Sequence, residues 1–398
     1  MSLFSELKKN VEPGPYFEDD GEISASTILP VKLVAYFLPQ FHRIPENDLW
    51  WGKGFTDWTN VTKSYPRFPG HYQPHLPGEL GFYDLSDPEI LYRQAALARR
   101  YGVHGFCIHH YWFGGKRLLE KPLKNLLDHP EIDIEFCLNW ANDNWSRRWD
   151  GSEHEILLLQ KHSPEDDIAL AQSLEAALAD RRYIRINGRP LLMIYRPGLL
   201  TDARATVERW RTHFVRAGLG DPYIIMPQAF GAYDPRESGM DAAAGFPPHH
   251  SGFDNAPLRR WTRLLSPRHK SIIRSYDAMV RRALANRPDF TYFPGVCPSW
   301  DNHARRQKGG QVFVGSTPQK YGEWLRGACE YVLSHSASEE RLVFVNAWNE
   351  WAEGTHLEPD RYYGYAFLAE TARVLNALPS RSTSLSEPQS RALSVPTN

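Results

Sequence analysis

Short apolar segments alternate with helical segments along most of the chain. Each apolar segment is nearly continuous in hydrophobicity, which is typical of strands that are buried on both faces of a parallel sheet. Turn-forming Gly, Pro, Asn or Asp residues follow most of them. The strands predicted in this way cover residues 32–38, 103–110, 134–140, 190–195, 223–229, 242–246, 291–298 and 342–348.

Helices are predicted between these strands, three of them with explicit start signals. Asp87, Ser163 and Thr317 each stand directly before a proline, which predicts an N-cap followed by Pro at the first helical position. The predicted helices cover residues 88–100, 164–180, 202–217, 271–285, 318–334 and 362–377.

Eight strands alternating with helices predict an α/β fold, a (β/α)8 TIM barrel with long loops after its first and third strands. A doubly wound sheet is the competing architecture. It usually has a Gly-rich phosphate-binding turn after the first strand, where this chain has Pro39-Gln40-Phe41-His42. The sequence therefore favours the barrel.

The chain divides into an N-terminal extension (1–30), a single barrel domain (31–378) and a polar tail (379–398) that we expect to be disordered. No segment approaches the roughly 18 apolar residues of a membrane helix, and no secretory signal is visible, so we expect a cytoplasmic protein without a membrane span. The four cysteines lie in apolar or helical segments and are expected to be free, buried thiols.

The composition is unusual in its aromatic residues, with 13 Trp, 19 Tyr and 19 Phe. The net charge of -1 argues against a nucleic-acid partner bound through a basic surface. Ten of the 13 tryptophans follow predicted strands, where barrels place their catalytic groups. This distribution points to a functional rim.

Indole rings with amide and carboxylate neighbours are typical of a sugar-binding site. The C–H face of a sugar stacks on indole, while polar side chains bond its hydroxyl groups. The alternative for each ring is that it packs the core of a loop. The candidate substrate-binding residues are Gln40, His42, Trp51, Asp57, Trp58, His109, Tyr111, Trp112, Asn139, Trp140, Asn142, Asp143, Trp145, His249, Trp300, Asp301, Trp348, Asn349, Trp351 and Thr355.

Glu350 and Glu353 are the candidate catalytic residues. They are three positions apart where the last predicted strand meets a turn marked by Gly354. On a helical turn, side chains at i and i+3 share a side, so both carboxylates would face one cleft. Two carboxylates in different environments supply the acid and the base or nucleophile of glycoside hydrolysis. The alternative is a salt-bridged pair on the barrel rim.

Metal and phosphate sites receive less support. The pairs His109-His110 and His249-His250 are adjacent in sequence and would face opposite sides of a strand, and no HExxH or paired CxxC motif occurs. We therefore expect no metal and no cofactor. Arg305, Arg306 and Lys308 follow the seventh predicted strand and are interpreted as a solvated loop, with a phosphate site as the alternative.

Four segments carry a resemblance to a known family. AYFLPQFHRIPENDLWWGKGFTDWTNV, GFCIHHYWF, FCLNWANDNWSRRWDG and NAWNEWAEGTHLEPD together resemble the WbsX-like proteins, which are similar to glycoside hydrolase family 99. The resemblance covers roughly residues 31–375 and implies a (β/α)8 barrel associated with bacterial lipopolysaccharide or other surface polysaccharides. A more distant similarity, through Asn349-Glu350-Trp351-x-Glu353-Gly354-Thr355, is to family 99 endo-α-mannosidases and mannanases.

This resemblance implies roles for the two glutamates. Glu350 would deprotonate the sugar 2-hydroxyl to give a 1,2-anhydro intermediate, and Glu353 would act as general acid and then as base, with retention. Mannose specificity does not carry over, because the Trp-rich loops after the first and third strands look particular to the WbsX group.

We therefore expect a metal-independent glycoside hydrolase acting on an oligosaccharide, a bacterial polysaccharide or a lipid-linked glycan. The alternative is a glycosyltransferase or another enzyme of lipopolysaccharide, O-antigen or exopolysaccharide biosynthesis. A carbohydrate-binding protein without turnover would keep the tryptophans but would not require both Glu350 and Glu353. The sequence carries no prediction of oligomeric state.

Overall fold

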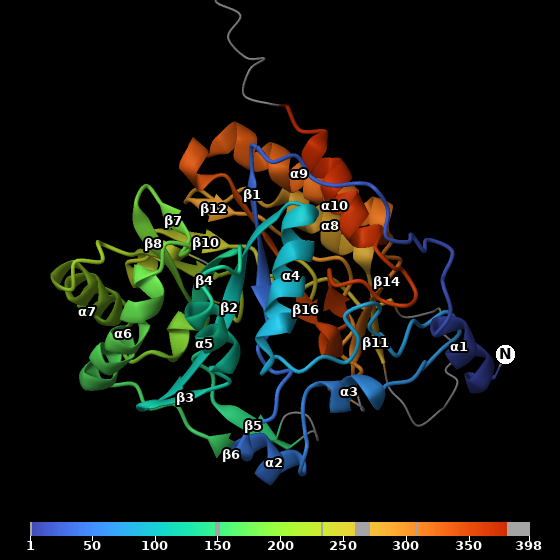
Figure 1. Cartoon of the computed structure of the whole chain (residues 1–398), viewed down its shortest axis with the longest axis horizontal. Helices are drawn as coiled ribbons and strands as arrows, with labels where there is room; N and C mark the ends of the chain where they lie inside the picture. Colours follow the sequence, from blue (N-terminus) through green and yellow to red (C-terminus); the bar gives the residue numbers. More distant parts are fainter. Residues whose placement is uncertain (1, 148–151, 232–233, 259–270, 307–308, 380–398) are drawn as a thin grey trace, which may run out of the picture.

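The computed structural model describes residues 2–147, 152–231, 234–258, 271–306 and 309–379. The predicted tail therefore lies outside the described residues, except for Pro379. Lys308 lies outside them as well. Parallel strands form a nearly closed barrel, in the order β12-β10-β9-β8-β4-β2-β1-β15-β13 (Figure 1). Their bounds are β1 Lys32–Phe37, β2 Val103–Phe113, β4 Glu135–Trp140, β8 Arg189–Ile194, β9 Tyr223–Pro227, β10 Ala242–Ala244, β12 Tyr292–Phe293, β13 Gly295–Val296 and β15 Leu342–Val345.

The barrel closes through its seventh predicted strand, which is split in two. Pro294 separates β12, which pairs with β10, from β13, which pairs with β15. The backbones approach so closely here that a Cβ on Gly295 would lie 2.1 Å from the carbonyl oxygen of Gly245. Each of the eight predicted apolar segments thus contains barrel strand, and the predicted (β/α)8 fold is confirmed.

Helices cover the outside of the strands (Figure 1). The three predicted N-caps are confirmed: Asp87, Ser163 and Thr317 each accept a backbone N–H from the first turn of their helix. The helix predicted from residue 271 begins later, because residues 272–275 pair with a second short strand. The outer helices are α4 Pro88–Arg100, α5 Lys121–Asp128, α6 Pro164–Ala179, α7 Ala203–Arg216, α8 Tyr276–Ala285, α9 Pro318–His335 and α10 Ala366–Asn376.

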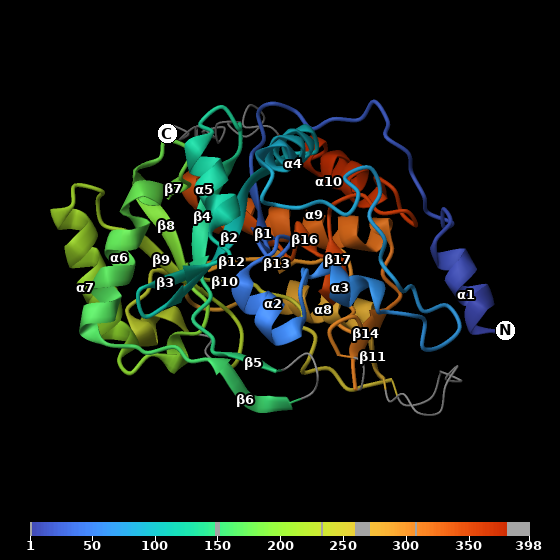
Figure 2. The same ribbon diagram turned by 60° about the horizontal axis from the view of Figure 1, so that its bottom comes forward.

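Smaller elements elaborate the loops, and several gather beside the barrel in Figure 2. The long loop after β1 carries two short helices, and the loop after β4 carries a hairpin. The 3-10 turns η2 Pro197–Leu199, η3 Pro235–Ser238 and η4 Ser338–Glu340 lie in other connections. The other elements are α2 Pro45–Trp51, α3 Trp58–Thr62, β3 Lys116–Leu118, β5 Trp145–Arg147, β6 Ser152–Leu158, β7 Arg185–Ile186, β11 Ile272–Ser275, β14 Gln311–Val314, β16 Asn349–Glu350, η5 Trp351–Glu353 and β17 Thr355–His356.

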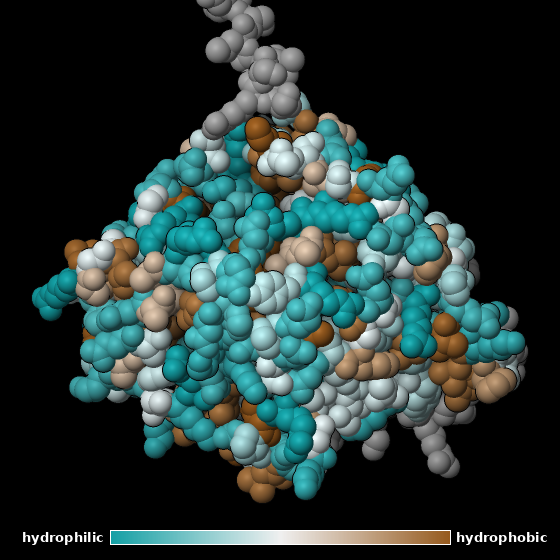
Figure 3. Space-filling view, viewed as in Figure 1, coloured by the Kyte–Doolittle hydropathy of each residue, from teal (hydrophilic) through white to brown (hydrophobic). Residues whose placement is uncertain are grey.

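The N-terminal extension begins with a helix, α1 Leu3–Asn10, which the apolar pattern did not predict. The amide of Asn10 fastens it to the loop after β1 by donating to the carbonyls of His71 and Gln73. Exposed Leu3 and Phe4 belong to this helix, and Figure 3 shows an apolar patch there on an otherwise largely hydrophilic face.

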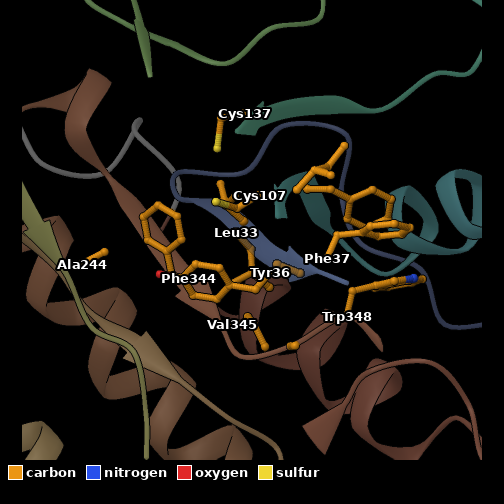
Figure 4. Close-up of a cluster of buried hydrophobic side chains, with 14 of the residues drawn as sticks. Leu33, Tyr36, Phe37, Cys107, Cys137, Ala244, Phe344, Val345 and Trp348 are labelled. Carbon is orange, nitrogen blue, oxygen red and sulfur yellow. The ribbon is translucent and has the colours of Figure 1, made fainter. Parts of the chain in front are cut away.

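The core fills the barrel interior and the space beneath the helices (Figure 4). Cys107 and Cys137 lie opposite each other on β2 and β4. All four cysteines are buried and unpaired, as predicted. Among the described helices, none has the length and apolarity needed to cross a membrane.

Candidate active site

A cavity of about 520 Å³ opens among the loops that follow the barrel strands. This is the end of the barrel where enzymes of this fold place their catalytic groups. Its wall is rich in aromatic side chains and contains both candidate glutamates. The wall consists of Leu38, Gln40, Asn47, Trp50, Trp51, His109, Tyr111, Ala141, Asp143, Asn144, Trp145, Ser146, Leu157, Tyr195, Phe230, Phe246, Pro248, His249, Phe253, Trp300, Asn302, Arg305, Arg306, Gln311, Asn346, Glu350 and Glu353.

A tight turn after β15 brings the two glutamates to this cavity. Glu350 ends β16, and Glu353 ends the 3-10 turn η5 before the chain returns through β17. Gly354 closes the turn at a φ of 59°, and a Cβ there would lie 2.9 Å from the carbonyl oxygen of Asp301. Because glycine alone tolerates both constraints, Gly354 allows the turn that puts Glu350 and Glu353 on one side.

The guanidinium of Arg305 joins the two carboxylates. Its Nη2 lies 3.0 Å from Oε2 of Glu350, and its Nη1 donates to Oε1 of Glu353 at 2.8 Å. Nη2 also donates to the buried carboxylate of Asp57 at 2.8 Å. Although burial lowers the pKa of Arg305, these three carboxylates hold that pKa well above its usual value. The interpretation of Arg305 as part of a solvated loop is therefore wrong, and its neighbour Arg306 also lines the cavity.

The two glutamates differ in their surroundings. The side chain of Glu350 is 10% exposed and that of Glu353 is 31% exposed. Burial, followed by the charges of Glu353 and Asp57, raises the pKa of Glu350 to about 8 despite the opposing charge of Arg305. Burial therefore favours the protonated form of Glu350. Such a contrast between neighbouring carboxyl groups is what acid–base chemistry requires.

Hydrogen bonds beneath the cavity hold the glutamate turn in place. The amide of Asn349 accepts from the backbone N–H of Leu38 at 2.7 Å and donates to its carbonyl at 3.0 Å. The indole of Trp351 donates to the buried carboxylate of Glu358 at 2.6 Å, and the hydroxyl of Thr355 donates to the carbonyl of Asn346. These side chains support the turn and lie outside the cavity wall.

Several predicted substrate-binding residues do line the cavity, and they come from the ends of different strands. The ring centroids of Tyr111 and Trp145 are 5.3 Å apart, and this contact joins the loops after β2 and β4. Burial, then the charge of Arg305, lowers the pKa of His109 to about 4, so its imidazole is neutral. The predicted residues in the wall are Gln40, Trp51, His109, Tyr111, Asp143, Trp145, His249 and Trp300.

Five predicted tryptophans lie outside the wall, because their rings pack inside the protein. Trp348 contacts Phe106 in the core (Figure 4), and Trp140 packs against Trp210. In the other three, the indole N–H donates to a group inside the protein: the carbonyl of Tyr83, the carboxylate of Asp166 or the carboxylate of Glu358. The five are Trp58, Trp112, Trp140, Trp348 and Trp351.

Seven polar candidates also lie outside the wall, and most of them form hydrogen bonds within the protein. Asn142 bonds the backbone of Arg196, and Nδ1 of His42 lies 2.8 Å from the carbonyl of Pro39. Asp57 and Asn139 lie one layer behind the wall, against Arg305 and His109. The full set is His42, Asp57, Asn139, Asn142, Asp301, Asn349 and Thr355.

Four further aromatic residues of the wall were not predicted from the sequence: Tyr195, Phe230, Phe246 and Phe253. Tyr195 directly follows β8 and Phe246 lies two residues after β10, so the position rule applied to tryptophan would also have found them. Phe230 and Phe253 lie farther along their loops and carry no such signal. Asn47 was missed because it belongs to a short helix inside the first loop.

Two groups of described residues bring metal-ligand atoms together: His71, Asp301 and His303, and His75, His356 and Asp360. In the first, Nδ1 of His71 accepts from the backbone N–H of Arg67, and its Nε2 donates to Asp301 at 2.6 Å. In the second, Nδ1 of His356 donates to the Glu358 carbonyl, so its Nε2 accepts from Nδ1 of His75 at 3.0 Å. Hydrogen bonds thus already use these ligand atoms.

Comparison with known proteins gives one family and one fold. A family model described as glycosyltransferase WbsX matches residues 33–371. WxcX proteins from two strains of Xanthomonas campestris pv. campestris are 43% identical over 368 residues and 44% identical over 362 residues. These alignments cover 92% and 90% of this chain but 52% of each relative, so the chain spans about half of their length.

Solved structures share the fold at low sequence identity. The GH99 endo-alpha-mannosidase from Bacteroides thetaiotaomicron matches with a TM-score of 0.53 and 16% identity, covering 86% of this chain and 96% of that one. A glycoside hydrolase-like protein matches with a TM-score of 0.56 and 15% identity, covering 91% and 99%. The family match extends over nearly the whole barrel, and the chain belongs to the WbsX family.

Proposed function

We propose that this chain cleaves a glycosidic bond in a bacterial polysaccharide or a lipid-linked glycan, with Glu350 and Glu353 as the reacting pair. One observation carries the proposal: both carboxylates lie in an aromatic cavity and share the guanidinium of Arg305. Aromatic rings bind the apolar faces of sugars, and paired carboxyl groups perform glycosidic cleavage. The similarity to WbsX and to glycoside hydrolase folds supports the same class of substrate.

In the proposed first step, Glu353 donates a proton to the glycosidic oxygen as the bond from that oxygen to C1 breaks. Glu350, in its ionised form, takes the proton of the sugar 2-hydroxyl, whose oxygen then bonds to C1. In the second step Glu353 takes a proton from water, and the water oxygen attacks C1. The bond from C1 to the 2-oxygen breaks, and Glu350 returns its proton to that oxygen. Two inversions at C1 give retention.

Arg305 stabilises the negative charge as it moves between the two carboxylates. Its guanidinium contacts Glu350 and Glu353 through different nitrogens, so it can hold both in one orientation. Asp57, behind the wall, also accepts from Nη2 of this guanidinium and helps to fix its position. This arrangement limits the reorganisation that the reaction needs.

The test compares wild type, Glu350→Gln and Glu353→Gln on a panel of bacterial surface polysaccharides. Turnover is measured as the release of new reducing ends. We expect each variant to lose several orders of magnitude in turnover, about equally, because the two groups act as a unit. Sugar binding should survive in Glu353→Gln. Glu208→Gln, at an exposed position of α7, is the matched control. Full activity of either active-site variant would contradict the proposal.

Glycosyl transfer from a nucleotide sugar is the second candidate, favoured by the description of the family and by Arg306 in the cavity wall. Three carboxylates already engage Arg305, which makes it a poor diphosphate ligand. Binding of UDP-, GDP- and dTDP-sugars by wild type and Arg306→Glu separates the two functions. We expect no binding by either protein. Nucleotide-sugar binding that is lost in Arg306→Glu would establish the transferase instead.

A further inference from the structure

One side of the cavity is built by α2 and the β5–β6 hairpin, which lie near each other in Figure 2. It contributes Asn47, Trp50, Trp51 and Trp145 to the wall. Trp145 lies at the junction of this side with the rest of the cavity. Its ring centroid is 5.8 Å from that of Trp50 and 5.3 Å from that of Tyr111. Tyr111 leads back to the glutamates, since the charge of Glu350 acts on its hydroxyl.

Asn47 is the unusual residue on this side. It is fully buried, yet neither its Oδ1 nor its Nδ2 has a hydrogen-bond partner in the protein. A buried amide without partners destabilises the folded state, so such a group calls for a ligand or for bound water. Asn47 also borders the cavity, so a ligand there would lie beside this amide.

The surrounding structure holds Asn47 and its aromatic neighbours in place. The ammonium of Lys116 on β3 pairs with Glu46 on α2. The Trp50 and Trp145 rings meet nearly at right angles, at 75°, and the ring of Phe113 contacts Trp145 at 5.6 Å. The indoles and the amide are therefore ordered before any ligand binds, which reduces the entropy lost on binding.

We propose that Asn47, Trp50, Trp51 and Trp145 form a second sugar subsite, which binds a neutral sugar unit next to the one whose bond is cleaved. This inference rests on the proposed function and adds that the substrate is an oligosaccharide or a longer glycan. The indoles provide a stacking surface. The amide of Asn47 offers one acceptor and a donor group, which match neighbouring sugar hydroxyls. None of the four side chains is charged, so the subsite is suited to a neutral unit.

The test measures binding in the Glu353→Gln background, where we expect turnover to be largely lost. The probes are the O-polysaccharide and exopolysaccharide of Xanthomonas campestris, with mono- to tetrasaccharides released from them by mild acid. Asn47→Leu keeps a similar volume and removes the amide. We expect at least a tenfold loss of affinity for tri- and tetrasaccharides, unchanged monosaccharide binding, and a Tm no lower than that of the parent. Leu49→Ala, at a position 81% exposed on the same helix, is the control and should change neither affinity nor Tm.

Three other outcomes would contradict the subsite, the proposed function or both. Equal oligosaccharide affinity in Asn47→Leu and its parent would overturn the subsite alone. A lower Tm in Asn47→Leu would show that the amide has a structural role, and it would overturn the subsite as well. If the Glu353→Gln parent bound none of the probes, the proposed function and the subsite would both fail.

Discussion

The guanidinium of Arg305 contacts the buried carboxyl group of Glu350, with Nη2 and Oε2 separated by 3.0 Å. The same guanidinium contacts Asp57 and Glu353, so one cation faces three carboxyl groups. Full ionisation of all three would leave excess negative charge in a place with little water. The raised pKa of Glu350 relieves this, because its carboxyl group keeps a proton near neutral pH.

Removal of the Arg305 cation should destabilise the protein strongly. In Arg305→Gln the carboxyl groups of Asp57, Glu350 and Glu353 face one another without a counter-ion. Loss of one partner of a buried pair typically costs about 3–5 kcal/mol of unfolding free energy. Urea denaturation monitored by circular dichroism measures this loss.

A surface ion pair provides the control for this experiment. Arg43→Gln breaks the pair between Arg43 and Asp48, in which the arginine side chain is 52% exposed, and should cost about 0–1 kcal/mol. The double variant Arg305→Gln/Asp57→Asn should lose less than the sum of its single variants, because it buries one fewer unpaired charge. Equal effects of Arg305→Gln and Arg43→Gln would contradict the importance of the buried pair.

The pH dependence of activity tests whether Glu350 and Glu353 act together as base and acid. The proposed mechanism needs Glu350 ionised and Glu353 protonated at the same time, so kcat/KM should follow a bell-shaped profile with one limb near 8, the pKa that burial gives Glu350. A profile without a limb near 8 would contradict a catalytic role for Glu350. A profile of kcat/KM from pH 5 to 10 decides between these outcomes.

Asp57→Asn should shift that limb in a defined direction. Asp57 raises the pKa of Glu350 through its charge, so its removal should lower this pKa and move the limb near 8 toward lower pH. The same group affects stability: a raised folded-state pKa stabilises at low pH, and this contribution is lost as pH rises from about 4.5 to about 8. The stability of Glu350→Gln should therefore fall less over that range than the stability of wild type.

The two histidine–aspartate groups are not expected to bind a metal ion. In both, hydrogen bonds among the histidine nitrogens, carboxylates and backbone already use the ligand atoms. We expect substoichiometric zinc, manganese and calcium by elemental analysis, and an unchanged Tm and activity after treatment with EDTA or 1,10-phenanthroline. One equivalent of tightly bound metal, or a Tm lowered by chelator, would show that one of these groups is a metal centre.

The sequence predicted the barrel because its signal is local. Buried parallel strands are apolar on both faces, and the prolines after Asp87, Ser163 and Thr317 mark helix starts. The split between β12 and β13 could not be predicted in this way, because it depends on the approach of Gly295 to Gly245 across the barrel. Position along the chain did not reveal that long-range contact.

The candidate site was predicted less completely, for a related reason. The rule that functional groups follow strands selected Glu350, Glu353 and Trp145, but it also selected Trp348, whose ring faces the core. Burial depends on the direction of each side chain, which sequence position does not determine. Arg305 was misinterpreted because its three carboxylate partners come from distant segments.

The contact between the two glycines leads to the last prediction. A Cβ on Gly295 would lie 2.1 Å from the Gly245 carbonyl oxygen, and backbone cannot move aside as a flexible side chain would. Gly295→Ala should therefore cost at least about 1–3 kcal/mol, the usual range for overpacking. Gly198→Ala is the control, since its Cβ would meet nothing within 4 Å. Urea denaturation of both variants measures the difference. Equal stability would mean that β10 and the segment joining β12 to β13 can move apart without a loss of unfolding free energy. Closure of the barrel at this junction would then not contribute to stability.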